Sequence, residues 1–428
     1  MTTRPNFLFL FSDQHRADWL GCSSDLPLKS PHIDGLANKG TQFTHAITPS
    51  PICSPARACL ATGLDFEHCG VATIHENLAI DKNTYYRSLR NSCYEVVGVG
   101  KFDLHKADMD WGLDGKMLLE EYGFTDGIDS EGKGDAIWAY RKEGRPKGPY
   151  LKYLEGRGLL EDYVGIYKPE SESLLFEAIN PLPDDAYCDT WIAQKGLDFL
   201  KSFSREKPWH LVVNFAGPHD PYDVTESMRQ RWEGVNFPSP VANNSDDPEI
   251  IQLRQQNYAA MIENIDSQVG RYIELLVERG ELENTIIVYS SDHGEMLGDH
   301  NRWQKSVWYQ GSVGVPLVVS GPGVQCQVSN ALISVHDIGA SFLDYAGVDG
   351  LQEADAASFR NVLQGEAKHH RRVLKSALGD WRMVFDGRFK LVLREGEETL
   401  LYDLKEDPSE IENLSEKFPC KVRQLSYL

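Results

Sequence analysis

The sequence has little positive charge, few cysteines and no long hydrophobic run. Its 43 lysines and arginines stand against 64 aspartates and glutamates, and the formal net charge of −21 argues against nucleic acid or an anionic membrane as the main partner. Eight cysteines in 428 residues are too few for a disulfide scaffold, and no C-x-x-C or C-x-x-H spacing indicates a zinc site.

We expect neither a signal peptide nor a transmembrane segment. The apolar run at residues 7–11 is shorter than the core of a signal peptide, and no segment approaches the length of a transmembrane helix. We therefore expect a cytoplasmic protein with reduced cysteines and no membrane association. Internal repeats and low-complexity linkers are absent, and the length suits one large domain plus a smaller one.

Four apolar runs each end in polar residues, which is typical of central strands in a parallel sheet. The carboxyl ends of such strands meet at one edge, where α/β proteins bind ligands. Helical stretches at 189–203 and 256–279 separate the later runs, as β-α-β alternation requires. We predict an α/β domain over residues 1–355 with a single site above the sheet. The runs are 6–11 before Asp13, 96–100 before Lys101, 209–215 before His219, and 285–289 before Asp292.

The last part of the chain has a different pattern. Residues 382–385 and 389–393 are short apolar runs on either side of Asp386-Gly387, which is a hairpin signal. We predict a small C-terminal α+β domain with an antiparallel sheet over residues 356–428. The polar stretch 118–181 reads as an insertion, and its pattern indicates no function.

The segment around Cys53 carries the strongest chemical signal. It reads C-S-P-A-R from Cys53 to Arg57, and Thr-Gly follows at 62–63. A cysteine in an apolar stretch is usually a buried structural thiol, but the fixed offsets of the proline, the arginine and the Thr-Gly pair favour a reactive role. The segment resembles the maturation signature of the type I sulfatases, C-x-P-x-R with a later Thr-Gly, in the alkaline-phosphatase-like superfamily.

This resemblance implies that a formylglycine-generating enzyme oxidises Cys53 to Cα-formylglycine, whose hydrated aldehyde is the nucleophile. It also implies the fold of the superfamily, a large mixed, mostly parallel sheet flanked by helices.

Two further segments resemble the metal-binding pairs of the family. Asp13-Gln14 matches the first pair, where many relatives have two aspartates, and Asp292-His293 matches the second. Together with the modified Cys53, the resemblance implies one divalent metal held mainly by oxygen atoms. Ca²⁺ fits such a site best, and Mn²⁺ or Mg²⁺ remain open. Without that context, Asp292-His293 would read as a helix cap beside a satisfied histidine.

Three more segments resemble the sulfate-binding residues of the family. Lys101 follows a glycine at the end of an apolar run, His219 lies in the string G-P-H-D-P-Y at 217–222, and Lys305 ends the string H-N-R-W-Q-K at 300–305. The resemblance implies that these side chains and Arg57 hold the sulfate group. It also implies that His219 or Lys305 gives the leaving alcohol its proton.

One segment departs from the family pattern. The family shows G-K-x-H, whose histidine removes a proton from the nucleophile, but here Asp103 stands at that position and His105 follows two residues later. Either His105 reaches the site, or Asp103 replaces the histidine, or the proton leaves elsewhere. We favour His105, because residues two apart on an extended segment point to the same face.

The resemblance implies a hydrolase that cleaves sulfate monoesters to an alcohol and sulfate, acting on a small-molecule or sugar sulfate. One alternative is a phosphonate monoesterase or phosphodiesterase of the same superfamily, because a similar tetrahedral anion fits the same residues. The second is a non-catalytic, metal-stabilised anion-binding protein in which Cys53 is never oxidised. The sequence specifies neither the alcohol nor the oligomeric state.

Overall fold

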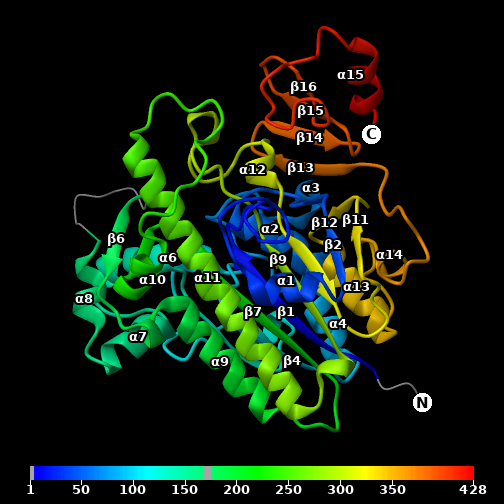
Figure 1. Ribbon diagram of the computed structural model, residues 1–428. Coiled ribbons are helices and arrows are strands. Elements are labelled where there is room, and N and C mark those ends of the chain that lie inside the picture. The colour runs from blue at the N-terminus through cyan, green and yellow to red at the C-terminus, as the bar shows by residue number, and fades with distance from the viewer. Residues whose placement is uncertain (1–3, 168–174) are drawn as a thin grey trace.

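The computed structural model describes residues 4–167 and 175–428 (Figure 1). At its centre lies an eight-stranded sheet in which β10 is antiparallel to both of its neighbours and the other pairs are parallel. This confirms the predicted mixed, mostly parallel sheet. In order across the sheet the strands are β11 (Gln327–Ser329), β2 (Thr41–Phe43), β10 (Leu317–Ser320), β9 (Thr285–Ser291), β1 (Asn6–Asp13), β7 (Trp209–Pro218), β4 (Glu95–Gly100) and β5 (Asp126–Asp129).

Strand β1 is buried on both faces of this sheet. Its side chains alternate in direction, so Phe7, Phe9 and Phe11 join the core on one face, whereas Leu8 and Leu10 join the core on the other. Both faces therefore need helices to cover them. The first face packs against α2 (Cys53–Thr62), α4 (Tyr85–Asn91) and α13 (Asp337–Ala346), and the second against α1 (Pro31–Ala37), α9 (Cys188–Ser202) and α11 (Pro248–Arg279).

The four predicted strands are β1, β4, β7 and β9, and the helix predicted at 189–203 is α9. The helix predicted from residue 256 begins earlier, at Pro248. The Asp247 carboxylate accepts a hydrogen bond from the Glu249 N–H at 2.9 Å, and a proline fits the first turn of a helix. The capping residue and the proline therefore determine where this helix begins. The spacing of apolar residues alone did not indicate this position.

The polar stretch 118–181 packs onto the second face of the sheet through buried apolar side chains such as Ile137, Tyr150 and Tyr163. Its residues 168–174 lie outside the described residues. The described elements of this stretch are α5 (Leu119–Tyr122), β5, α6 (Lys133–Glu143), α7 (Pro149–Gly156), α8 (Leu160–Gly165) and β6 (Glu177–Asn180), which pairs with β8 (Tyr222–Thr225).

Shorter elements connect these parts. None of the helices described has the length and apolar character of a membrane span. The shorter elements are β3 (Ala46–Ile47), paired with β12 (Ile333–Ser334), the helices α3 (Phe66–Cys69), α10 (Glu226–Trp232), α12 (Gln310–Val313) and α14 (Arg360–Leu363), and the 3₁₀ turns Lys106–Asp108, Asp184–Ala186, Leu282–Asn284 and Asp299–Asn301.

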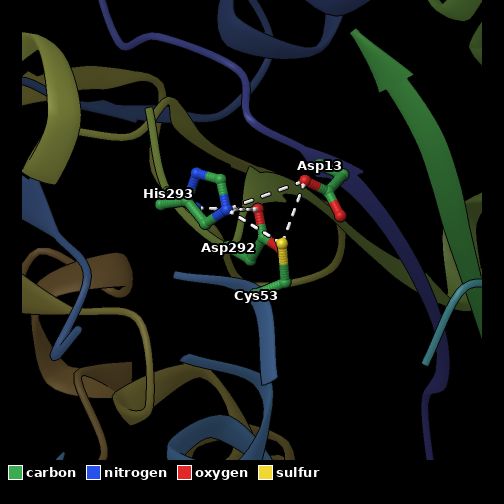
Figure 2. Close-up of side chains that lie close together, drawn as sticks. All are labelled: Asp13, Cys53, Asp292 and His293. Atoms are coloured by element: carbon green, nitrogen blue, oxygen red, sulfur yellow. Dashed lines mark hydrogen bonds and ion pairs between the residues drawn. The ribbon is translucent and has the colours of Figure 1, made fainter. Parts of the chain in front are cut away.

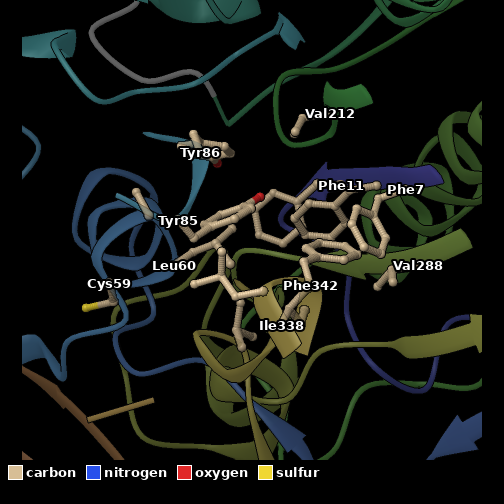
Figure 3. Close-up of a cluster of buried hydrophobic side chains, with 14 of the residues drawn as sticks. Phe7, Phe11, Cys59, Leu60, Tyr85, Tyr86, Val212, Val288, Ile338 and Phe342 are labelled. Carbon is tan, nitrogen blue, oxygen red and sulfur yellow. The ribbon is translucent and has the colours of Figure 1, made fainter. Parts of the chain in front are cut away.

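Aromatic rings fill the core between the sheet and α13 (Figure 3). The ring of Phe342 on α13 lies 5.0 Å from that of Phe7, 5.7 Å from that of Phe9 and 4.9 Å from that of His210, measured between centroids. Burial lowers the pKa of His210 to about 3, so its imidazole is neutral and packs as another ring of this cluster. Phe342 thus joins strands β1 and β7 to the helices above them.

The C-terminal part contains the predicted small antiparallel sheet, formed by β13 (Leu374–Leu378), β14 (Trp381–Phe385), β15 (Phe389–Arg394) and β16 (Leu400–Asp403). Helix α15 (Pro419–Ser426) packs on one side of it through Leu425, and Ile47 and Val313 pack on the other. Between residue 356 and β13, the side chains of Phe359 and Val362 lie in the core of the large sheet. The small sheet itself begins at Leu374.

The small sheet holds a loop of the large domain. The buried Lys390 ammonium group on β15 donates to the Trp308 carbonyl at 3.0 Å and pairs with the Glu410 carboxylate at 2.7 Å. The other oxygen of that carboxylate accepts from the Gln310 N–H at 2.6 Å. Trp381 on β14 donates from Nε1 to the Ser306 carbonyl at 3.3 Å. The loop at 303–310 is therefore fixed from the C-terminal side.

We expect Phe342→Ala to lower the free energy of unfolding by about 3–5 kcal/mol, because it leaves a cavity among aromatic rings that cannot collapse. Urea denaturation followed by circular dichroism measures this change. Val277→Ala on α11, where the native side chain is 59% exposed, is the control and should change little. Equal effects of the two substitutions would contradict the assigned role of Phe342.

Candidate active site

The carboxyl ends of four neighbouring strands deliver polar side chains to one place, as predicted. Asp13 ends β1, Lys101 follows β4, His219 follows β7 and Asp292 follows β9. The chain turns at Gly100 with φ of 97°, and a Cβ atom there would lie 1.9 Å from a backbone oxygen of β7. Glycine is therefore required at the end of β4 for Lys101 to enter the site.

Asp13, Cys53, Asp292 and His293 form a buried cluster whose candidate ligand atoms all lie within 4.8 Å of one another (Figure 2). The Cys53 sulfur lies 3.3 Å from His293 Nε2 and 3.7 Å from Asp13 Oδ1. His293 Nε2 is 3.7 Å from Oδ1 of both Asp13 and Asp292. The structure therefore brings together four of the five predicted metal ligands.

Arg57 connects the members of this cluster from beneath. Its Nε donates to Asp292 Oδ2 at 2.9 Å and its Nη2 to Asp13 Oδ2 at 3.2 Å, while Nη1 donates to the Lys101 carbonyl at 2.5 Å and to Asn214 Oδ1 at 3.3 Å. The guanidinium group thus satisfies its donors within the protein. The structure places it behind the carboxylates, and it does not line the cavity above them.

The donor set fits a divalent metal. Arg57 occupies Oδ2 of both carboxylates, which leaves Oδ1 of Asp13 and of Asp292 facing His293 Nε2. His293 Nδ1 lies 3.0 Å from the Gly294 carbonyl, and donation there leaves the Nε2 lone pair free for a metal. Two carboxylate oxygens and one imidazole suit Ca²⁺, Mg²⁺ or Mn²⁺.

The two carboxyl groups of the cluster have opposite pKa shifts. Burial raises the pKa of Asp13, but the attraction of Lys101 and further cations outweighs burial and holds that pKa well below its usual range. Burial and the nearby Asp13 charge raise the pKa of Asp292. Burial and Asp13 also act to raise the pKa of Cys53, but Lys101 and neighbouring cations lower it well below the ordinary thiol value.

Gln14, the fifth predicted ligand, lies beside the cluster. Its N–H donates to Asp292 Oδ1 at 3.0 Å, while its side-chain amide donates to Asp220 Oδ1 at 3.0 Å and to Glu295, and accepts from Lys305. The sequence analysis did not single out the buried carboxylates of Asp220 and Glu295. Asp220 lies inside the string G-P-H-D-P-Y and Glu295 follows His293 by two residues, and this proximity to recognised residues was the available signal.

His219 and Lys305 line the cavity beside Cys53, whereas Arg57 does not. The Lys305 ammonium group donates to His219 Nε2 at 2.5 Å. His219 Nδ1 lies 2.6 Å from the Asp220 carbonyl, so it carries the hydrogen and Nε2 is the acceptor. These two residues form one proton-holding pair.

The structure does not bring His105 to the cluster. Its Nε2 pairs with Asp129 Oδ2 at 2.9 Å, its ring stacks on Tyr122, and it does not line the cavity. The same-face argument fails because Asp103 has φ of 54°, so the segment is not extended. Asp103 instead places Oδ2 3.2 Å from the Lys101 ammonium group, and its buried Oδ1 has no hydrogen-bond partner among the described residues.

Above the cluster opens a cavity of about 480 Å³. Its lining includes α6 and the 3₁₀ turn at Lys106–Asp108, for which the sequence indicated no role. The lining residues are Ile52, Cys53, Ile74, His75, Lys101, Lys106, Ala107, Met109, Gly132, Lys133, Gly134, Asp135, Trp138, Ala216, His219, Asp220 and Lys305.

Comparisons with known proteins give one consistent result. The model of the sulfatase family matches residues 5–348, and a model for the C-terminal region of N-sulphoglucosamine sulphohydrolase matches residues 298–424. An arylsulfatase of Clostridium perfringens is 26% identical over 99% of this chain and 93% of that protein.

Two solved structures have the same fold. The phosphonate monoester hydrolase of Agrobacterium radiobacter superposes with a TM-score of 0.82 at 22% identity, covering 99% of this chain and 94% of that one. A protein in complex with its substrate D-glucosamine-2-N,6-O-disulfate superposes with a TM-score of 0.77 at 19% identity, covering 99% and 96%. Because the family model spans most of its length, this chain belongs to the sulfatase family and has an alkaline-phosphatase-like fold.

Proposed function

We propose that this protein hydrolyses sulfate monoesters, using a formylglycine made from Cys53 and one divalent metal, with Ca²⁺ the best fit. The convergence of Cys53 with Asp13, Asp292 and His293 at the floor of a cationic cavity carries this proposal. The printed names of relatives, among them arylsulfatase and N-acetylglucosamine-6-O-sulfatase, support a sulfate ester of a small alcohol or a sugar.

The metal would be held by Asp13, Asp292 and His293 with an oxygen of residue 53, whose Sγ marks the place of a formylglycine hydroxyl. The bound metal would supply a Lewis acid, and the formylglycine would supply an oxygen nucleophile. Maturation by a formylglycine-generating enzyme is part of the same proposal.

The side chains around residue 53 hold the anion and move protons. The Lys101 ammonium group lies 3.6 Å from Cys53 Sγ and bonds Asp13 at 2.5 Å, so it places positive charge where a sulfate oxygen must sit. Lys305 provides a second cation across the cavity. Because it shares a hydrogen bond with His219, this pair can give a proton to the departing alcohol.

Asp103 is better placed than His105 to act on residue 53. Its carboxylate contacts the Lys101 ammonium group, which contacts Cys53, whereas His105 is tied to Asp129. We therefore propose that Asp103 orients Lys101 and accepts a proton from its ammonium group, while Lys101 takes the proton that leaves residue 53. The earlier preference for His105 receives no support from this geometry.

A second candidate activity is hydrolysis of phosphonate monoesters or phosphodiesters. Its support is the close superposition with a phosphonate monoester hydrolase, since a tetrahedral anion of either element fits the same cations. The non-catalytic alternative requires an unmodified thiol at Cys53. Mass spectrometry of the peptide that contains Cys53 tests this requirement.

Cys53→Ala should reduce sulfate release by more than about 10³-fold while leaving the fold intact, because it removes the nucleophile and little volume. In the native protein made with the maturation enzyme, the peptide containing Cys53 should be about 18 Da lighter than its thiol form. An unmodified peptide, or full activity in the variant, would refute the assignment.

Asp103→Asn should lower the turnover number by about 10- to 100-fold, as loss of a supporting carboxylate does. His105→Ala should affect thermal stability more than turnover, since it breaks a buried pair with Asp129. Steady-state kinetics with an aryl sulfate and thermal denaturation separate these effects. A larger kinetic loss in His105→Ala would restore His105 as the base.

We expect kcat/KM for 4-nitrophenyl sulfate to exceed that for the phenylphosphonate ester of 4-nitrophenol. The two esters share the leaving group, so their comparison reports on the central atom. Measuring both with one preparation of known formylglycine content avoids differences in maturation. The opposite order would favour the phosphonate monoesterase.

A further inference from the structure

We propose that the alcohol part of the substrate is an apolar ring system and that Trp138 on α6 selects it. This inference rests on the proposed sulfate ester hydrolysis. It concerns residues of the same cavity that were not among the predicted site residues.

Four large apolar side chains form a wall of the cavity, whose lining also contains charged residues and His75. Ile52, Ile74, Met109 and Trp138 form this wall, and they come from the chain before α2, from the loop after α3, from the end of the 3₁₀ turn, and from α6. The cationic floor and this wall belong to one continuous cavity of about 480 Å³. A substrate bound by its sulfate at the floor therefore places its alcohol against the wall.

Two lysines of the lining, Lys133 and Lys106, are already paired with carboxylates. The Lys133 ammonium group pairs with Asp223 at 2.7 Å and donates to the Pro221 carbonyl at 2.8 Å. The Lys106 ammonium group pairs with Asp135 at 2.8 Å and Asp103 at 3.4 Å. These lysines thus offer the cavity their hydrocarbon stems more than their charges.

Asp220, the remaining carboxylate of the lining, accepts hydrogen bonds from Gln14 and from Gln304. A sugar brings several hydroxyl groups, each of which loses water on binding and needs a partner in return. Apart from His75, the polar side chains of the lining are already paired, so they supply such partners less readily. An apolar ring loses little by leaving water and gains contact area.

Trp138 is the largest side chain of this wall. It is 36% exposed, although its neighbours Ala136, Ile137 and Ala139 on α6 are buried. The Arg141 guanidinium carbon lies 5.5 Å from the centre of the indole ring and packs over it. A fixed, partly exposed indole beside a cavity is well suited to cover the ring of a ligand.

The test compares 2-naphthyl sulfate with N-acetylglucosamine 6-sulfate in the native protein, Trp138→Ala and Trp138→Phe. Trp138→Ala should lower kcat/KM for 2-naphthyl sulfate about tenfold, mainly through KM, and change that for the sugar sulfate less than about twofold. Trp138→Phe should keep most of the selectivity. Because leaving-group reactivity is the same in all three proteins, the change in the ratio reports on Trp138 alone.

Two controls accompany this comparison. Leu113→Ala removes a side chain that is 51% exposed and does not line the cavity, so it should leave both substrates unchanged. Calorimetric binding of the two esters to Cys53→Ala, with and without Trp138→Ala, measures selection in the absence of turnover. Circular dichroism confirms that each variant is folded.

Three outcomes would overturn the inference. Equal losses for both esters in Trp138→Ala would mean that the indole has only a structural role. Tighter binding of the sugar sulfate than of 2-naphthyl sulfate to Cys53→Ala would reject the apolar alcohol while leaving sulfate ester hydrolysis intact. Release of sulfate from neither ester by protein with confirmed formylglycine would reject the proposed function, and the inference with it.

Discussion

The site depends on the Arg57 guanidinium group between the carboxylates of Asp13 and Asp292. Two buried carboxylates side by side repel each other, and burial alone would favour their neutral forms. Arg57 offsets this repulsion and joins the ends of β1 and β9 to α2. Cys53 lies four residues before Arg57 on the same helix, so the two share one face. The spacing of the C-x-P-x-R string therefore has a geometric reason: the residue that organises the carboxylates also aims position 53 at them.

The acidic composition of the chain is compatible with an anionic substrate because charge is distributed unevenly. Lys101 and Lys305 face the cavity, where the enclosing protein strengthens their fields. The buried carboxylates near them are each engaged by cations or by amide groups, as Asp220 is by Gln14 and Gln304. Net charge thus argues against nucleic acid or an anionic membrane as the main partner, but it carries no information about the sign of the local potential.

Sequence reasoning predicted the strands and their polar ends well, because runs apolar on both faces have few alternatives in a folded chain. It placed Asp13, Lys101, His219 and Asp292 at one edge for that reason. It did not find the contacts made by Asp220 and Glu295, which depend on tertiary approach, or the contribution of α6 to the cavity lining. The His105 argument assumed extended backbone, and the left-handed conformation of Asp103 removes that premise.

The way in which the C-terminal sheet holds the loop at 303–310 affects what can be exchanged between relatives. Lys390, Glu410 and Trp381 fix the backbone around Lys305 from a part of the chain that follows it by many residues. A chimaera joined between the two sheets would combine the loop at 303–310 of one protein with the C-terminal sheet of another. The loop at 303–310 and the C-terminal residues that hold it should therefore be exchanged together. The boundary between the large and the small sheet is an unsuitable position at which to join two relatives.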